Sequence, residues 1–368
     1  MKNGSAAMFL TISLVIFFAG CLYLAWRISA GLNLHSLWIY AAFVFMGIVA
    51  FAALYGMHRQ MTGGSFIVPV GYVFVGVWGI LITVFILNDI VNVANLFLKL
   101  ENFRYYSTVA AITVATALVV WSFINYTLIL NITKVKIEVP NLPVESLRIV
   151  QLSDLHVSGY VSAGRMNRIF NKVEQLKPDM IVITGDVIDT DMLKGDKYKK
   201  YGFEKLKEMK VPYGVYAITG NHDHYAGLQS FYEMFERLGV KVLNNENVLV
   251  KNTINVAGIN DIDHKNQAVI AQTLFGTCRN FPVLFLSHRP EAFDIASKLP
   301  IKFLQLSGHT HAGQIPPIEI ARRFFMKFNY GIYRENGSVM YVTSGTRLWG
   351  PPMRSFNTSE IVVITLER

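Results

Sequence analysis

The residues best suited to chemistry lie in the last two thirds of the chain, where His, Asp and Asn follow short apolar runs. Two pairs are spaced two residues apart, Asp154 with His156 and His309 with His311, and in an extended chain such residues point to one face. The full set of ligand-type residues is Asp154, His156, Asp186, Asn221, His288, His309 and His311. Carboxylate, imidazole and amide ligands suit divalent metals such as Mn, Fe, Co, Ni or Zn, so we predict a metal site.

Five apolar segments must position these residues. Each is a continuous apolar run, which is typical of a buried strand. The five segments are residues 147–152, 180–184, 215–219, 283–286 and 303–306. In open α/β sheets, ligands bind beyond the carboxyl ends of the strands, which is where the polar residues of this chain fall. Glycines at 185, 220 and 308 allow tight turns beside the predicted metals.

The five blocks, in this order, resemble the calcineurin-like metallophosphoesterase superfamily over residues 147–366. The run Gly-His-Thr-His-Ala-Gly-Gln at 308–314, with Ser-Gly-Thr at 344–346 and Trp-Gly-Pro-Pro-Met-Arg at 349–354, is similar to a membrane-associated branch of that superfamily. Some enzymes of this branch cleave the pyrophosphate of UDP-diacylglucosamine, a lipid precursor. The resemblance implies an α/β fold, a four-layer sandwich of two mixed β-sheets flanked by helices.

The resemblance also implies roles for individual residues. One metal would be bound by Asp154, His156, Asp186 and His311, and the second by Asp186, Asn221, His288 and His309. Mn is the favoured metal, and a metal-bound hydroxide would attack phosphorus. His222 would donate a proton or hydrogen bond to the leaving oxygen, oriented by Asp223. Asp189 would hold a ligand in place.

The first 130 residues differ in composition from the rest and carry only seven charged side chains. They contain four apolar runs that are long enough to cross about 30 Å of hydrocarbon, at about residues 8–26, 34–55, 66–87 and 108–130. Four runs in series exclude a cleaved signal peptide. We therefore predict a four-helix transmembrane region at 1–130, followed by a catalytic domain at 131–368.

Basic residues near these runs indicate the orientation. One side carries Lys2, Arg59, Lys134 and Lys136, and the other carries Arg27, Lys99 and Arg104. The positive-inside rule then predicts a multi-pass protein of the cell membrane with a cytoplasmic catalytic domain. Asp89 lies at the predicted end of the third span, where we expect exposure at the interface. Cys21 and Cys278 fall in separate regions, so we predict no disulfide.

Residues 318–333 combine basic and aromatic side chains, and this combination bears on the substrate. Phe324, Phe325 and Phe328 fall on one helical face, as in a helix on a membrane surface. The alternative is a helix packed in the core. We expect the three phenylalanines, with Arg354 of the C-terminal motif, to contact substrate.

Together these features predict a dinuclear phosphoester hydrolase that acts on a lipid-linked phosphodiester or pyrophosphate. Two alternatives stay open: a tethered phosphodiesterase for soluble nucleotides, and a non-catalytic membrane sensor, against which the intact ligand set argues. The net charge of +9 would suit anionic partners. Zinc-finger spacing and basic runs with interleaved aromatics are missing from the sequence, so the bilayer and a phosphoester, not nucleic acid, are the predicted partners.

Overall fold

The chain divides into two compact units. The computed structural model describes residues 2–34, 36–58, 67–158, 161–189 and 197–368. The helical unit holds Met1–Leu128 together with two later segments, Gly313–Phe324 and Gly350–Phe356. The sandwich unit holds Ile129–Ala312, Phe325–Trp349 and Asn357–Arg368.

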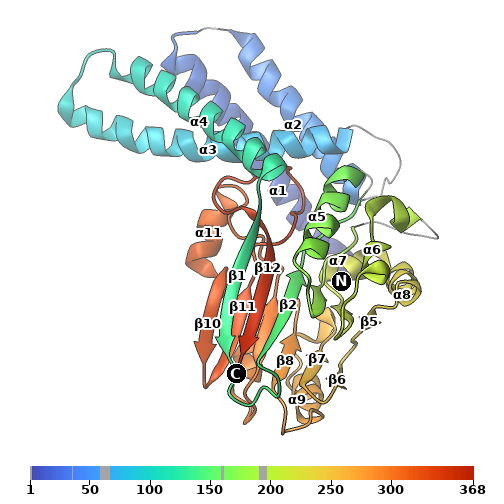
Figure 1. Ribbon diagram of the computed structural model, residues 1–368. Coiled ribbons are helices and arrows are strands. Elements are labelled where there is room, and N and C mark those ends of the chain that lie inside the picture. The colour runs from blue at the N-terminus through green and yellow to red at the C-terminus, as the bar shows by residue number, and fades with distance from the viewer. Residues whose placement is uncertain (1, 35, 59–66, 159–160, 190–196) are drawn as a thin grey trace. The chain divides into compact units, whose positions relative to one another are not determined.

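Four helices form most of the helical unit (Figure 1): α1 (Lys2–Gly31), α2 (Leu37–His58), α3 (Ile67–Leu98) and α4 (Phe103–Leu128). The two later segments complete its packing, since Ile315 and Met353 join Leu24 and Phe85 in the buried cluster of this unit. The segment at 313–324 also carries most of α11 (Ile318–Phe325). The helical unit is therefore assembled from three separate stretches of sequence.

Three helices of the described chain are long and apolar enough to cross a membrane, over Leu14–Gly31, Val68–Leu98 and Phe103–Leu128. The apolar stretch of α2, Leu37–Ala52, is shorter. Of the four predicted spans, three are therefore found among the described residues. Three residues used in the prediction, His35, Arg59 and Phe66, lie outside the described residues.

Asp89 lies within α3 and not at its end, because that helix continues to Leu98. Its carboxylate pairs with the guanidinium of Arg27 on α1 and accepts a hydrogen bond from the Tyr23 hydroxyl at 2.6 Å. Exposure at a membrane interface was the expected explanation for this carboxylate. A salt bridge to a neighbouring helix explains it instead.

The sandwich unit is built on two six-stranded mixed sheets. The first has the order β1 (Leu130–Glu138), β12 (Ser359–Glu367), β2 (Ser146–Leu152), β3 (Met180–Thr184), β4 (Val215–Ile218), β5 (Lys241–Val242). The second has the order β10 (Gly331–Glu335), β11 (Ser338–Val342), β9 (Leu304–Ser307), β8 (Val283–Leu286), β7 (Ile254–Gly258), β6 (Glu246–Val250). Strands β2 to β5 are parallel, as are β7, β8, β9 and β11. The antiparallel pairs are β12 with β2, β6 with β7, and β10 with β11.

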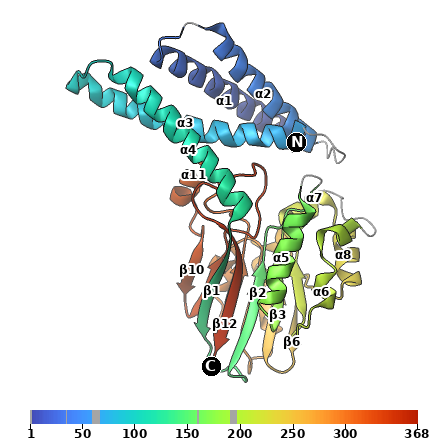
Figure 2. The ribbon, with the colours of Figure 1, turned by 45° about the horizontal axis from the view of Figure 1, so that its top comes forward.

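Helices cover the outer faces of both sheets (Figure 2). The first sheet packs against α5 (Ala163–Gln175), α6 (Lys205–Glu208) and α8 (Leu228–Arg237). The second packs against α9 (Gln267–Phe275) and α10 (Ala292–Ala296). A third buried cluster lies between the sheets and includes Ile149, Val182, Leu284 and Leu306. The short elements are η1 (Lys197–Tyr201), α7 (Asn221–Ala226) and η2 (Asp261–Asp263).

The predicted four-layer α/β sandwich of two mixed sheets is therefore confirmed. The five predicted strands correspond to β2, β3, β4, β8 and β9, with bounds that differ by no more than one residue at either end. A fully buried strand gives an unbroken apolar run, and β3, β4 and β8 are buried at every position. This is why these strands are legible in the sequence.

Candidate metal centre

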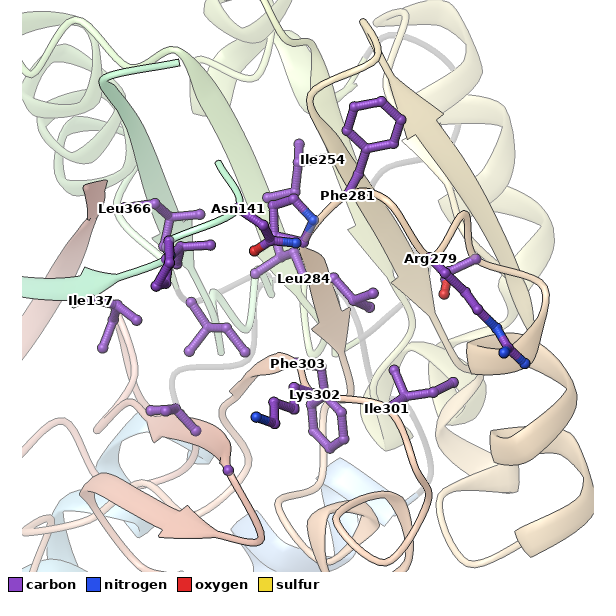
Figure 3. Close-up of a pocket in the computed structure, with 18 of the residues that line it drawn as sticks. Ile137, Asn141, Ile254, Arg279, Phe281, Leu284, Ile301, Lys302, Phe303 and Leu366 are labelled. Atoms are coloured by element: carbon purple, nitrogen blue, oxygen red, sulfur yellow. The ribbon is translucent and has the colours of Figure 1, made fainter. Parts of the chain in front are cut away.

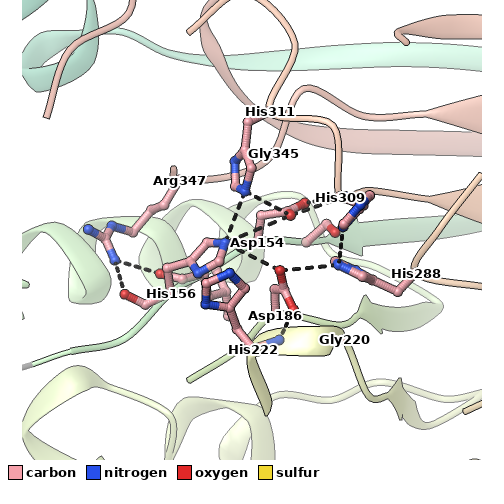
Figure 4. Close-up of polar contacts among 12 residues, drawn as sticks. Asp154, His156, Asp186, Gly220, His222, His288, His309, His311, Gly345 and Arg347 are labelled. Atoms are coloured by element: carbon pink, nitrogen blue, oxygen red, sulfur yellow. Dashed lines mark hydrogen bonds and ion pairs between the residues drawn. The ribbon is translucent and has the colours of Figure 1, made fainter. Parts of the chain in front are cut away.

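The ligand-type residues converge where five parallel strands end (Figure 4). Metal-binding atoms of Asp154, His156, Asp186 and His311 lie within 4.8 Å of one another. Those of Asp186, His288 and His309 form a second such group. Asp186 belongs to both groups, so its carboxylate occupies the place of a bridge between two neighbouring cation sites.

The backbone at these positions is unusual. Positive φ angles occur at Asp154 (55°), His156 (44°), Asp186 (53°), His309 (72°) and His311 (49°). Residues other than glycine rarely adopt this left-handed conformation, which concentrates at functional sites. These turns after the strands aim the side chains inward, and the glycines beside them provide room.

Two glycines permit the close approach of the ligand loops. A Cβ at Gly220 would overlap the carboxylate of Asp186, and a Cβ at Gly308 would overlap the side chains of Ser153 and Asp154. Both overlaps involve short, buried side chains, and the one at Gly220 also reaches the backbone nitrogen of Asp186, so neither is readily relieved. Glycine is therefore required here for packing of the loops against each other.

Hydrogen bonds orient the histidine rings. Nδ1 of His288 lies 2.8 Å from the Thr184 carbonyl oxygen, which only accepts, so Nδ1 carries the proton. The other nitrogen, Nε2, faces Asp186 Oδ2 at 3.2 Å and His309 Nδ1 at 3.3 Å. Two imidazole nitrogens and a carboxylate oxygen directed at one point suit a cation.

The first group is built in the same way. Nδ1 of His156 lies 2.6 Å from Asp189 Oδ1, which leaves Nε2 facing His311 Nε2 at 3.1 Å. Asp189 lies a few residues after β3, whereas the ring of His156, which it holds, lies after β2. A carboxylate behind a metal-binding imidazole fixes the ring and makes it a stronger ligand.

Asn221 supplies a further sign of a cation site. Its side-chain oxygen is buried, and within the described part of the chain it accepts no hydrogen bond. Leaving a buried acceptor unpaired costs about 1–3 kcal/mol, and an amide oxygen is a suitable metal ligand. With the two groups that share Asp186, this residue indicates a dinuclear centre for divalent metals.

The electrostatics of the cluster also favour cations. Burial alone would lower the pKa of His288, but the charge and hydrogen bond of Asp186, with the charge of Asp154, raise it to about 10. Burial alone would raise the pKa of Asp186, but His288 and His156 hold it well below its usual range. The carboxylates therefore keep the imidazole of His288 protonated. Metal ions bound at the site would displace that proton.

His222 is oriented by a different carboxylate from the one expected. Its Nδ1 lies 3.0 Å from Asp189 Oδ1. Asp223 instead accepts the backbone N–H groups of Gly220, Val187 and Ile188 at 2.8–2.9 Å. Asp223 thus braces two ligand loops, and its expected role in orienting His222 is wrong.

The environment of His222 stabilises its protonated form. Burial alone would lower the pKa of this imidazole, but the hydrogen bond to Asp189 and the charge of Asp186 outweigh burial and raise it. Burial alone would raise the pKa of Asp189, but His156 and His222 lower it to about 2. A protonated imidazole backed by an ionised carboxylate is suited to proton donation.

Aromatic rings surround His222 in a way that sequence reasoning missed. The ring centroids of His156, Trp349 and Tyr225 lie 4.8, 5.4 and 5.6 Å from that of His222. Tyr225 is 66% exposed and so reaches solvent beside the site. Trp349 was noted only as part of a motif, because nothing in the sequence places it next to α7.

Arg347 is a second residue that sequence reasoning missed. Its guanidinium is buried, and Nη1 donates to the backbone carbonyls of Leu155 and His156 at 2.5 and 2.9 Å (Figure 4). The two carbonyls belong to the loop after β2, which holds two candidate ligands. Arg347 therefore fixes that loop from the other end of the sequence, and its only sequence signal is its place after Ser-Gly-Thr.

The residues expected to contact substrate divide into two groups. Phe324 and Phe325, at the end of α11, are 80% and 88% exposed. Phe328 lies beyond the helix end and is buried, with its ring 5.8 Å from Phe293 and 5.0 Å from Tyr333. The predicted single face is wrong for Phe328, because the helix stops before it.

Arg354 is the fourth residue expected to contact substrate. Its side chain is fully buried, and the expected contact stays a prediction. Its backbone N–H donates to Ser122 and its carbonyl accepts from Asn125, both at 3.0 Å. Arg354 therefore belongs to the packing of the segment 350–356 on α4.

Known proteins are similar in sequence to the part of the chain that holds the candidate metal centre. Residues 147–313 match the model of the family described as calcineurin-like phosphoesterase. A "transmembrane protein with metallophosphoesterase domain" from Danio rerio is 33% identical over 281 residues, which cover 72% of this chain and 63% of that relative. The corresponding protein of Bos taurus is covered to 62%, so the chain spans less than two thirds of these two relatives.

A bacterial relative is covered more fully. An uncharacterized metallophosphoesterase from Campylobacter jejuni is 31% identical over 277 residues, which cover 72% of both chains. Among solved structures, a 5′-nucleotidase precursor from Thermus thermophilus is similar over 60% of this chain and 54% of that chain, with 14% identity and a TM-score of 0.36. The family match contains all seven candidate ligands and both histidine groups described above. The chain belongs to the calcineurin-like phosphoesterase family.

Proposed function

We propose that this protein hydrolyses a lipid-linked phosphodiester or pyrophosphate at the cell membrane. Membership of the family supports a hydrolase acting on phosphoester bonds. The observation that carries the proposal is that two groups of ligand atoms share Asp186. Such sharing suits a pair of divalent ions, for which Mn is the favoured metal, and two ions roughly 3.5–4 Å apart are typical of phosphoesterases.

The bound cations would supply Lewis-acid stabilisation of the phosphoryl group and an activated water. The chain supplies the rest. Asp186 would bridge the two sites, and Asp189 holds the rings of His156 and His222 through one carboxylate oxygen. Because Nδ1 of His222 faces Asp189, its Nε2 is left to donate a proton to the leaving oxygen.

The lipid part of the proposal rests on α11. Ile318, Phe324 and Phe325 are 52%, 80% and 88% exposed. Arg322 and Arg323 lie on the same short helix, and Arg323 is held by Glu319 at 3.1 Å. Exposed aromatic and basic side chains together suit a membrane surface. Phe328 is no longer part of this surface.

The membrane arrangement is part of the same proposal. We assign residues 1–130 as a multi-pass anchor and 131–368 as the catalytic domain, facing the cytoplasm. The three apolar helices and the transmembrane relatives support a membrane protein. The bilayer would then hold the enzyme next to lipid-linked substrates at high effective concentration.

A tethered phosphodiesterase for soluble nucleotides is the second candidate. It is favoured by the exposed ring of Tyr225, which lies beside His222 together with Trp349. Aromatic rings of this kind stack against flat bases. The sensor without catalysis is disfavoured, because all the acidic and imidazole ligands that a dinuclear centre needs are gathered in the described chain.

A substrate panel separates these candidates. The full chain in lipid nanodiscs would be stripped with a chelator, reloaded with Mn, and tested against lipid-linked pyrophosphates, nucleotide diesters and a generic aryl phosphodiester. We expect the highest kcat/KM on a lipid-linked substrate. Higher kcat/KM on nucleotides would support the second candidate. No hydrolysis of any ester after reloading with Mn, Fe, Co, Ni or Zn would contradict an enzyme.

A further inference from the structure

A hollow lies at the end of the sandwich away from the candidate metal centre (Figure 3). It is a cavity of about 570 Å³ within the sandwich unit. The candidate ligands follow the carboxyl ends of β3, β8 and β9, whereas the cavity is lined at the starts of β7, β8 and β9 by Ile254, Val283 and Leu304. It is therefore separate from the dinuclear centre.

Both sheets contribute apolar walls. Ile137 and Leu366 come from β1 and β12 of the first sheet, and Leu284 and Leu304 come from the second. These side chains belong to the packed cluster between the two sheets and are at most 7% exposed, so they form the closed floor of the cavity. Its volume lies within the range of about 300–1,000 Å³ that is usual for small-molecule sites.

One wall of the cavity is fixed by a buried asparagine. The side-chain amide of Asn255 donates to the carbonyls of Cys278, Phe281 and Pro282 at 2.9, 3.1 and 3.3 Å, and its oxygen accepts from the Cys278 N–H at 2.9 Å. Asn255 is 1% exposed. Thr277, Phe281 and Pro282 of this loop line the cavity, so the protein's own hydrogen bonds hold this wall in place.

The cavity has a cationic lining at its polar positions. Arg279 and Lys302 both line it, against a single carboxylate, Glu138, among the lining residues that the structure describes. The carbon stem of Lys302 packs on Gly337, where an added Cβ would lie 3.1 Å from Cε of the lysine. Gly337 has a φ of 79°, so this turn suits glycine and gives the lysine stem its place.

We infer that this cavity binds a single-chain amphiphile with an anionic head, either a carboxylate or a phosphate. An apolar body would lie along the partly exposed apolar lining, such as Phe275 and Ile301, and the head would bind Arg279 or Lys302, whose charged ends point apart (Figure 3). Charge complementarity favours the anion, because a cationic head would be repelled by these side chains and an uncharged head would form no charge-assisted hydrogen bond with them. The inference concerns a site of its own and does not depend on the substrate proposed above.

Cys278 provides a direct probe of this site. It is exposed, it lies between the lining residues Thr277 and Arg279, and the other cysteine, Cys21, is buried. The full chain in nanodiscs would be labelled at Cys278 with an environment-sensitive fluorophore. It would then be titrated with decanoate, decyl phosphate, decanol and decyltrimethylammonium. We expect saturable binding of the two anions only.

Charge reversal tests the contacts. Arg279→Glu and Lys302→Glu should each weaken anion binding about tenfold or more, as expected for the loss of a charged hydrogen-bond partner. Lys251→Glu is the matched control, because Lys251 is exposed, stacks on Tyr213 and does not line the cavity. Phosphoester hydrolysis should be unchanged in all three variants, which shows that they are folded.

The outcomes decide the inference and the source of the ligand. Tighter binding of decanoate would indicate fatty acids, and tighter binding of decyl phosphate would indicate lipid phosphates. An equal response to decanol, or unaltered affinity in both charge reversals, would overturn the inference. Unlabelled protein gives a second measurement, since an anionic ligand should raise its thermal midpoint and decanol should not.

Discussion

The two ends of the sandwich share strands β8 and β9 yet carry opposite chemistry. At the ligand end, acidic and imidazole groups are buried together and their hydrogen bonds are fixed. At the cavity end, apolar side chains surround a hollow with two cations on its lining. The two ends of a parallel sheet differ, because the loops that follow the carboxyl ends of its strands all lie together at one edge. The difference shows that catalysis and core packing are separable within this unit.

The largest effect is expected at the shared ligand. Asp186→Asn should reduce turnover by at least about 10³-fold, because it removes the bridging charge and a Lewis-acid centre is worth several kcal/mol. Metal content per chain should fall in the same variant. Elemental analysis and kcat on an aryl phosphodiester would measure both.

Asp179→Asn is the matched control at the other end of the same strand. Asp179 directly precedes β3, and its carboxylate accepts the backbone N–H of Arg148 at 2.8 Å, which an amide oxygen can also do. Turnover and metal content should be unchanged. Equal losses in the two variants would erase the distinction between the ends of the sandwich.

His222→Ala should lower turnover by about 10²–10⁴-fold, the usual range for general acid catalysis, while metal content stays near normal. The loss should shrink for esters with very good leaving groups, which need no proton. His264→Ala is the control, since that histidine bonds to the Asp261 carbonyl and belongs to neither ligand group. Metal loss in His222→Ala would make His222 a ligand.

The pH profile gives a second test of His222. Because the pKa of its imidazole is raised, the acid form persists above the usual histidine range. Turnover should fall as pH rises through this raised pKa, since the proton donor is then lost. The variant without the imidazole should lack this decline, and an identical decline in both would assign the proton to another group.

The same division between the ligand end and the rest of the protein separates what the sequence could predict from what it could not. Ligands such as Asp154 and His311 stand in short motifs after buried strands, so these motifs and the family resemblance that they carry predicted them. The carboxylate that orients His222 could not be identified in this way. Asp223 is next to His222 in the sequence, and Asp189 lies in the loop after β3, so both were candidates. Only the structure shows that the Asp223 carboxylate accepts three backbone N–H groups instead.

Contacts between segments that are distant in the chain could not be predicted from the sequence. Arg347 binds carbonyls of the loop after β2, and Met353 joins the core of the helical unit. Hydropathy marks the apolar helices of the first unit, but it does not show which distant segments complete their core. The cavity is lined by side chains from several strands and loops of both sheets, and no periodicity in the sequence predicts such a set.

The exposed end of α11 gives a smaller, substrate-selective effect. Phe324→Ser with Phe325→Ser should lower kcat/KM on a lipid-linked substrate about tenfold or more, because burying one phenylalanine is worth about 1.5–3 kcal/mol. Activity on a small soluble ester should be unaltered. Phe328→Ser is the contrast, since it removes a core ring and should cost about 3–5 kcal/mol of folding free energy. Parallel loss of both activities in the double variant would refute a lipid role for α11.

The smallest effect is expected at Trp349, whose ring lies 5.4 Å from His222. An aromatic pair is worth about 0.5–1.5 kcal/mol beyond burial, so Trp349→Ala should slow turnover by about 2- to 10-fold. If the ring acts by holding the imidazole, the two substitutions cannot be independent. Trp349→Ala made in the His222→Ala background should then change turnover no further. Tyr225→Ala is the companion variant, because Tyr225 flanks the same ring but is mostly exposed and should matter less. Additive losses from Trp349 and His222 would instead mean that the tryptophan contacts the substrate directly, and the ligand end would then extend beyond the metal loops.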